Sequence, residues 1–150
     1  MQWTDPTANE RGQKVRVVLE RIQILDDQDP WFKSQGEFRF TTQAHSRNNG
    51  GSIQEHRLPG SGHLAISDKA GRNIVRLDMS VFEGFVEDHL AIDVTGVELD
   101  TFDPDDNLCR YRRVFSGAPA TFLGSYGPGD EKIEAEDLGD WRLWYRIERA

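Results

Sequence analysis

Two acid-rich stretches, residues 26–32 and 100–107, contain the side chains of this chain best suited to chemistry. Carboxylates crowded in this way repel one another unless a cation lies among them. A hard cation such as Ca²⁺ takes about six to eight oxygen ligands, and aspartates on loops commonly supply them. The sequence therefore predicts a Ca²⁺ site shared by the two stretches. The candidate ligands are Asp26, Asp27, Asp29, Asp100, Asp103, Asp105 and Asp106.

The second stretch does not follow the EF-hand pattern. The spacing of Asp103, Asp105 and Asn107 matches the first three ligand positions of that motif. However, Leu108 stands where glycine is required, and Val114 stands where the bidentate glutamate belongs. Aspartate is also a common turn former, so a pair of solvated turns without metal is the alternative interpretation.

Each stretch lies between segments whose pattern predicts β-strands. In residues 36–45, Phe38, Phe40 and Ala44 alternate with polar residues, which is typical of a half-buried antiparallel strand. Residues 141–148 alternate in the same way, with Trp144 on the polar face. Further strands are expected over residues 15–25, 52–58, 63–67, 72–82, 89–99, 108–116 and 121–123, and a helical turn within 130–138.

Two of these strands change their apolar phase partway along. The change lies near Glu20 and Arg21 in the first strand, and at Gly96 in the strand over residues 89–99. One extra residue in a strand turns every later side chain to the opposite face of the sheet. We therefore expect a β-bulge at both places.

Seven to nine short strands separated by turn residues predict an all-β fold, an antiparallel β-sandwich. A chain of 150 residues is long enough to bury its own core. We expect a single domain over residues 15–150, preceded by a loose polar arm over residues 1–14.

The composition excludes several classes of function. The formal net charge of −8 argues against nucleic acid as a partner, because phosphate binding requires a basic face. No apolar run has the length of a signal peptide core or a membrane span, so we expect a cytoplasmic protein without a transmembrane segment. The single cysteine, Cys109, excludes an internal disulfide, and we expect it to be buried and inert.

The sequence Asp29-Pro30-Trp31-Phe32, followed by an alternating strand, resembles the first calcium loop of C2 domains. Residues 90–106, an apolar strand that enters an aspartate cluster, are similar to the third loop of that family. The resemblance covers roughly residues 15–147 and is carried by these two short motifs. It implies a C2-like sandwich with Ca²⁺ as cofactor. It also implies that Trp31 and Phe32 contact a lipid surface or a protein partner, unless both rings pack inward.

These observations predict a non-catalytic, calcium-dependent binding or assembly module. A metal-free structural or protein-interaction sandwich is the first rival. The second is a carbohydrate-binding module that uses Trp3, Trp31 and Trp144, or an enzyme whose site lies in the loop region 117–129. An enzyme is the less favoured reading, because the chain lacks a nucleophile elbow, a P-loop and a closely spaced zinc pair.

Overall fold

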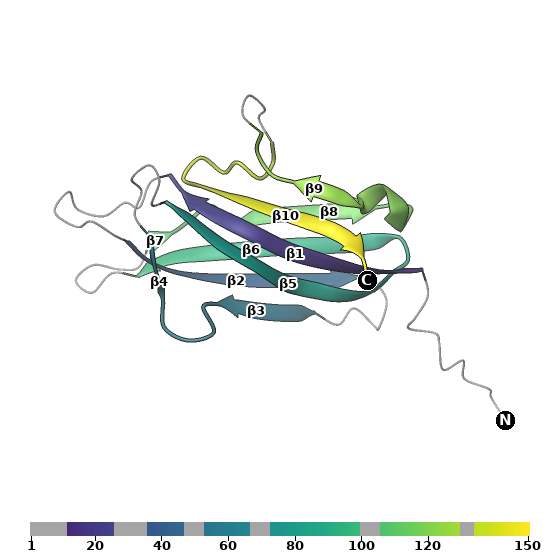
Figure 1. Ribbon diagram of the computed structural model, residues 1–150, viewed down its shortest axis with the longest axis horizontal. Helices are drawn as coiled ribbons and strands as arrows, with labels where there is room; N and C mark the ends of the chain where they lie inside the picture. The colour runs from purple at the N-terminus through teal and green to yellow at the C-terminus, as the bar shows by residue number, and fades with distance from the viewer. Residues whose placement is uncertain (1–11, 26–35, 47–52, 67–72, 100–105, 130–133) are drawn as a thin grey trace.

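The computed structural model describes residues 12–25, 36–46, 53–66, 73–99, 106–129 and 134–150. Two antiparallel sheets pack against each other, which confirms the predicted β-sandwich (Figure 1). The strands are β1 (Gln13–Ile24), β2 (Gly36–Ser46), β3 (Gln54–Leu58), β4 (Leu64–Ile66), β5 (Ile74–Val86), β6 (His89–Leu99), β7 (Asp106–Asn107), β8 (Tyr111–Ser116), β9 (Gly124–Tyr126) and β10 (Trp141–Arg149). The two-residue strand β7 was not expected from the sequence.

The first sheet has the strand order β5-β1-β10-β9, and the second has the order β3-β2-β6-β7. Strand β4 also pairs with β2, and strand β8 also pairs with β6. The inward faces of both sheets form one hydrophobic core, in which the rings of Phe40 and Trp141 lie 5.3 Å apart and join the two layers. Across the described residues, no helix has the length and apolar character that spanning a membrane requires.

The β-bulge predicted in the first strand is confirmed. The register of β1 shifts between Leu19 and Arg21 against both neighbouring strands, β10 and β5. Leu19 and Ile22 are consequently both buried, although residues three positions apart lie on opposite faces of a regular strand. The bulge keeps β1 apolar toward the core along its whole length.

The second predicted bulge, at Gly96, is wrong for the pairing of β6 with β2. That ladder runs without a break from the pair Glu37–Leu99 to the pair Ser46–Leu90. Gly96 instead makes room for a ring, because a Cβ there would lie 2.6 Å from Cε1 of Phe40. The inward phase therefore continues through Gly96 and buries Glu98, whereas Val97 and Leu99 stay on the outer face.

Three local expectations also require correction. The region expected as a strand over residues 121–123 contains a 3₁₀ helix, Pro119–Phe122, and the strand β9 follows it. Within residues 134–138, the described part of the expected helical turn, no helix forms. Cys109 is exposed and lies outside the strands, because its backbone is held by Asp140 and Trp141 while its side chain points away from the core.

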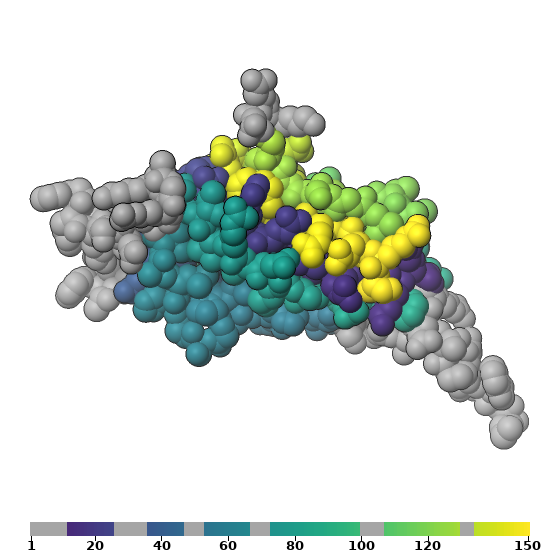
Figure 2. Space-filling model, in the orientation of Figure 1, coloured from purple at the N-terminus to yellow at the C-terminus, as the bar shows by residue number. Residues whose placement is uncertain are grey.

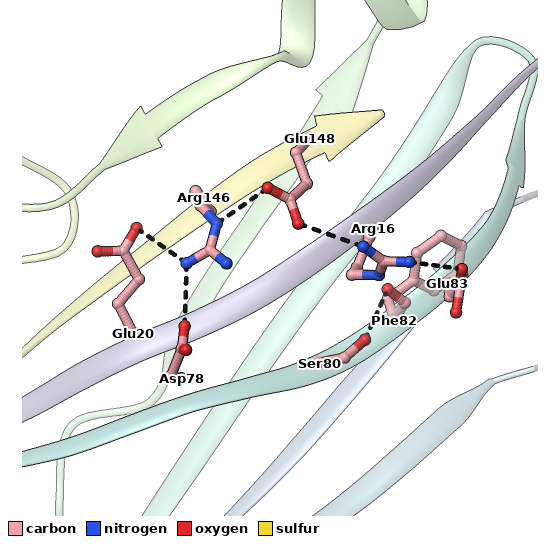
Figure 3. A network of polar contacts seen from close by, with 8 residues as sticks. All are labelled: Arg16, Glu20, Asp78, Ser80, Phe82, Glu83, Arg146 and Glu148. Carbon is pink, nitrogen blue, oxygen red and sulfur yellow. Dashed lines mark hydrogen bonds and ion pairs between the residues drawn. The ribbon is translucent and has the colours of Figure 1, made fainter. Parts of the chain in front are cut away.

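The outer face of the first sheet presents β5, β1 and β10 side by side (Figure 2). Charged side chains of opposite sign alternate across these strands (Figure 3). Arg16 contacts Glu83 and Glu148 at 3.0 and 3.4 Å. Arg146 contacts Glu148 and Asp78 at 3.0 and 3.1 Å. These charges satisfy one another, so this face presents paired charges rather than an open binding site.

Candidate functional site

Of the aspartates predicted as ligands, the structure describes only Asp106. Asp106 belongs to β7, where it pairs with Glu98. The other predicted ligands lie outside the described residues, as do Trp31 and Phe32. The structure does place the strand ends that flank the two acid-rich stretches.

Three of these strand ends lie side by side in the second sheet. Glu37 at the start of β2 pairs with Leu99 at the end of β6, and Glu98 pairs with Asp106 at the start of β7. Neighbouring strands in a sheet are separated by about 4.8 Å. The strand that follows the first stretch and the two strands that flank the second are therefore neighbours in this sheet.

The first sheet contributes the remaining strand end, that of β1. The backbone N–H of Leu25, the residue that follows β1, donates to the carbonyl of Asp140 at 2.9 Å. The carboxylate of Asp140 accepts a hydrogen bond from the backbone N–H of Cys109 at 3.2 Å. Cys109 follows closely after β7, and Leu108 donates to the carbonyl of Gly96 in β6 at 2.9 Å. Asp140 thus links the two sheets at this end of the sandwich.

A third connection starts from the same end. Ile66, the last residue of β4, pairs with Gly36 at the start of β2. Asn73 holds the end of β1, because its carbonyl accepts from the N–H of Ile24 and its side-chain amide donates to the carbonyl of Ile24. Residues 67–72, which include Asp68, join these two points and lie outside the described part of the chain. In Figure 1 the arrowheads of β1 and β6 mark this end at the left.

Two described acids at this end were missed by the sequence reasoning. Asp140 keeps its Oδ2 on Cys109, whereas its Oδ1 is buried and accepts no hydrogen bond from the described residues. Glu98 is only 2% exposed and faces inward between Phe38 and Asp106 in the ladder. No periodic signal marks Asp140, because its position depends on contacts with Leu25 and Cys109. Glu98 was hidden by the incorrect bulge at Gly96.

The carboxylate groups of Asp140 and Glu98 are of the kind that binds a hard cation. Carboxylate oxygens are the ligands that Ca²⁺ prefers, and a buried carboxylate oxygen without a donor is costly unless something positive faces it. Among the described residues alone, no three histidine, cysteine or carboxylate side chains lie close enough together to hold a metal ion. The described carboxylates therefore do not form a metal site by themselves.

A second polar cluster lies between the sheets, and its members are hydrogen-bonded to one another. The hydroxyl of Tyr111 lies 2.6 Å from the carboxylate of Glu136 and 2.6 Å from the hydroxyl of Tyr145. Arg113 donates to the same carboxylate at 2.9 Å. Burial, together with the neighbouring acid, raises the pKa of Tyr111 and that of Tyr145 above their ordinary values, so both stay neutral. This cluster ties residues 134–138 to β8 and β10.

Trp144 lies on the outer face of the first sheet, as its place in the alternation predicts, but much of its ring is engaged. The guanidinium of Arg21 lies over the ring, 4.4 Å from its centroid. The indole N–H donates to the carbonyl of Pro128 at 3.0 Å, and the backbone of Gly127 packs against the pyrrole ring. The loop that follows β9 is therefore a support for Trp144.

No protein-family model matches this chain, and no curated protein is significantly similar to it in sequence. The resemblance to C2 domains stays a prediction carried by the two short motifs that contain the aspartates.

Proposed function

We propose that this protein is a non-catalytic, calcium-dependent binding module whose Ca²⁺ site lies at the end of the sandwich where β1 and β6 finish. The observation that carries the proposal is the chain of hydrogen bonds from β2 through β6 and β7 to Cys109, Asp140 and Leu25. That chain holds the strand ends that flank both acid-rich stretches at one end of the fold.

The proposed ligands are the aspartates of the two stretches, assisted by Asp140. A calcium ion needs more oxygen donors than one short segment supplies, so ligands from several connections are expected. The Oδ1 atom of Asp140 is buried and accepts no hydrogen bond within the described part of the chain, which supports a cation nearby. Ca²⁺ would offset the repulsion among these carboxylates and order the connections for a partner. Trp31 and Phe32, which follow Asp29 closely in the sequence, are the proposed contacts with a partner, either a lipid surface or a protein.

Thermal unfolding tests the calcium site directly. Midpoints are compared in excess EDTA, in millimolar CaCl₂ and in millimolar MgCl₂. A ligand that binds only the folded state stabilises it by ~2.7 kcal/mol at a hundredfold excess over Kd. We expect a rise with Ca²⁺ that is lost in Asp27→Asn and in Asp105→Asn.

The control is Asp88→Asn, because Asp88 lies in the turn between β5 and β6, at the opposite end of the sandwich. That variant should keep the full response to Ca²⁺. Coincident midpoints in all three buffers would overturn the proposal and favour a metal-free interaction sandwich.

The carbohydrate-binding alternative rests on exposed tryptophans. Trp3 and Trp31 lie outside the described residues, and Trp144 already holds Arg21 over its ring and Pro128 at its N–H. Stacking on a sugar requires a free aromatic face, so these contacts favour the calcium proposal over the carbohydrate one. Glycan binding that Trp144→Ala abolishes would reverse this preference.

A further inference from the structure

A hollow of about 120 Å³ lies on the outer face of the second sheet, away from the end that holds the aspartates. Strand register sets its floor, because Gln43 of β2, Asp93 of β6 and Arg112 of β8 form one row across the sheet. In the next row Ala91 lies between His45 and Val114. The short side chain of Ala91 between larger neighbours accounts for the depression.

Arg110, Arg112 and Asp93 line the hollow, and Glu55 lies beside it, opposite Gln43. Arg110 engages the carboxylate of Asp93 through its Nε, at 2.9 and 3.1 Å, and through its Nη2. That fork leaves Asp93 matched by one guanidinium. Arg112 is exposed and makes no ion pair with any residue in the described part of the chain. An arginine in this position keeps its planar set of donors available for an incoming anion.

Uncharged and apolar groups complete the surroundings. The side-chain amide of Gln43 donates to Glu55 at 3.3 Å, so its carboxamide is held in place beside the hollow. Ile53, which lines the hollow, is 56% exposed, and Val114 is 45% exposed. Ile53 and Arg112 line the same hollow, and this combination suits a ligand with an anionic head and an apolar body.

We propose that this hollow binds a small organic acid, with its carboxylate on Arg112 and its apolar body against Ile53 and Ala91. A hollow of about 120 Å³ with this lining suits one carboxylate and a short hydrocarbon chain. Arginine recognises a carboxylate through two parallel N–H···O bonds. The site shares no residue with the proposed calcium site.

The test uses sodium hexanoate as the probe, titrated into the ¹⁵N-labelled full chain in excess EDTA so that calcium plays no part. We expect saturable shifts of the backbone amides of Gln43, Ala91 and Arg112. Hexanoate should bind more tightly than acetate, which lacks the apolar body, and more tightly than 1-hexanol, which lacks the charge. Absence of saturable shifts would overturn the proposal, as would 1-hexanol or inorganic phosphate binding as tightly as hexanoate.

Matched variants separate this site from general attraction to positive charge. Arg112→Gln should weaken hexanoate binding about tenfold or more, because it removes a charge-assisted bond. Arg57→Gln is the control, since Arg57 is an exposed arginine of β3 opposite Thr41 on the same face. Equal losses in both variants would contradict a localised site. Ala91→Leu fills the hollow, and unchanged hexanoate affinity in this variant would also overturn the assignment.

Discussion

The carboxylate of Asp140 accepts a hydrogen bond from the backbone N–H of Cys109 at 3.2 Å, which joins the strand connection of one sheet to that of the other. The same residue holds Leu25 through its backbone carbonyl. The Asp140 carboxylate therefore has two roles: its hydrogen bond holds the structure, and its negative charge would act on the proposed cation. Substitution can separate the two.

Asp140→Asn keeps an oxygen that accepts from Cys109 but removes the charge. We expect nearly unchanged stability in EDTA and a smaller rise of the midpoint with Ca²⁺. Asp140→Ala also loses the hydrogen bond and should cost about 1 kcal/mol in EDTA as well. Thermal unfolding of both variants, with and without Ca²⁺, measures the two contributions. An Asn variant with the full calcium response would remove Asp140 from the proposed ligand set.

Tyr111→Phe should be strongly destabilising for so small a change. Its hydroxyl contacts Glu136 and Tyr145 between the sheets, so the variant leaves two buried polar groups short of a partner. An unsatisfied buried group costs about 1–3 kcal/mol. Urea unfolding should show a lower midpoint with an unchanged slope. Arg146→Gln, in the exposed network of Figure 3, is the comparison and should change the midpoint much less.

Gly124, the first residue of β9, and Gly127, in the loop that follows β9, provide a matched pair. Both have a φ of 145°, but a Cβ on Gly127 would lie 2.1 Å from Cδ1 of Trp144, whereas a Cβ on Gly124 meets nothing within 4 Å. Both alanine variants therefore carry the same backbone strain, and only Gly127→Ala adds a clash. We expect a further loss of about 1–3 kcal/mol and altered tryptophan fluorescence in Gly127→Ala alone. Equal stabilities would show that the loop yields without cost.

Glu148 gives the exposed network a pH dependence. The hydrogen bond from Arg146 lowers the pKa of Glu148 below its ordinary value of 4.5, and Arg16 acts in the same direction. The stabilisation is therefore complete above the unfolded pKa and is lost as the pH falls through the lower folded pKa.

Glu148→Gln should accordingly be less stable than the parent chain at neutral pH, and the difference should shrink in acid. Chemical unfolding over a pH series measures this, with Glu55→Gln as the control for an exposed glutamate outside the network. A difference that does not depend on pH would contradict the assignment.

Local patterning was sufficient to predict most of the strands and the class of fold. The alternation of Phe38, Phe40 and Ala44 places one face of β2 in the core, because successive side chains of a strand point to opposite faces. The phase change near Glu20 predicts the bulge in β1 for the same reason. These features depend only on neighbours in sequence.

Only the tertiary structure decided what lies beside what. Gly96 reads as a break in the pattern until the ring of Phe40 is placed against it, and the burial of Glu98 follows from that contact. Asp140 and the hollow at Ala91 likewise depend on residues distant in the chain. The amino-acid sequence determined which segments are strands, since that depends on local periodicity. The packing and register of the sheets decided which polar groups meet, since those contacts join residues from separate strands.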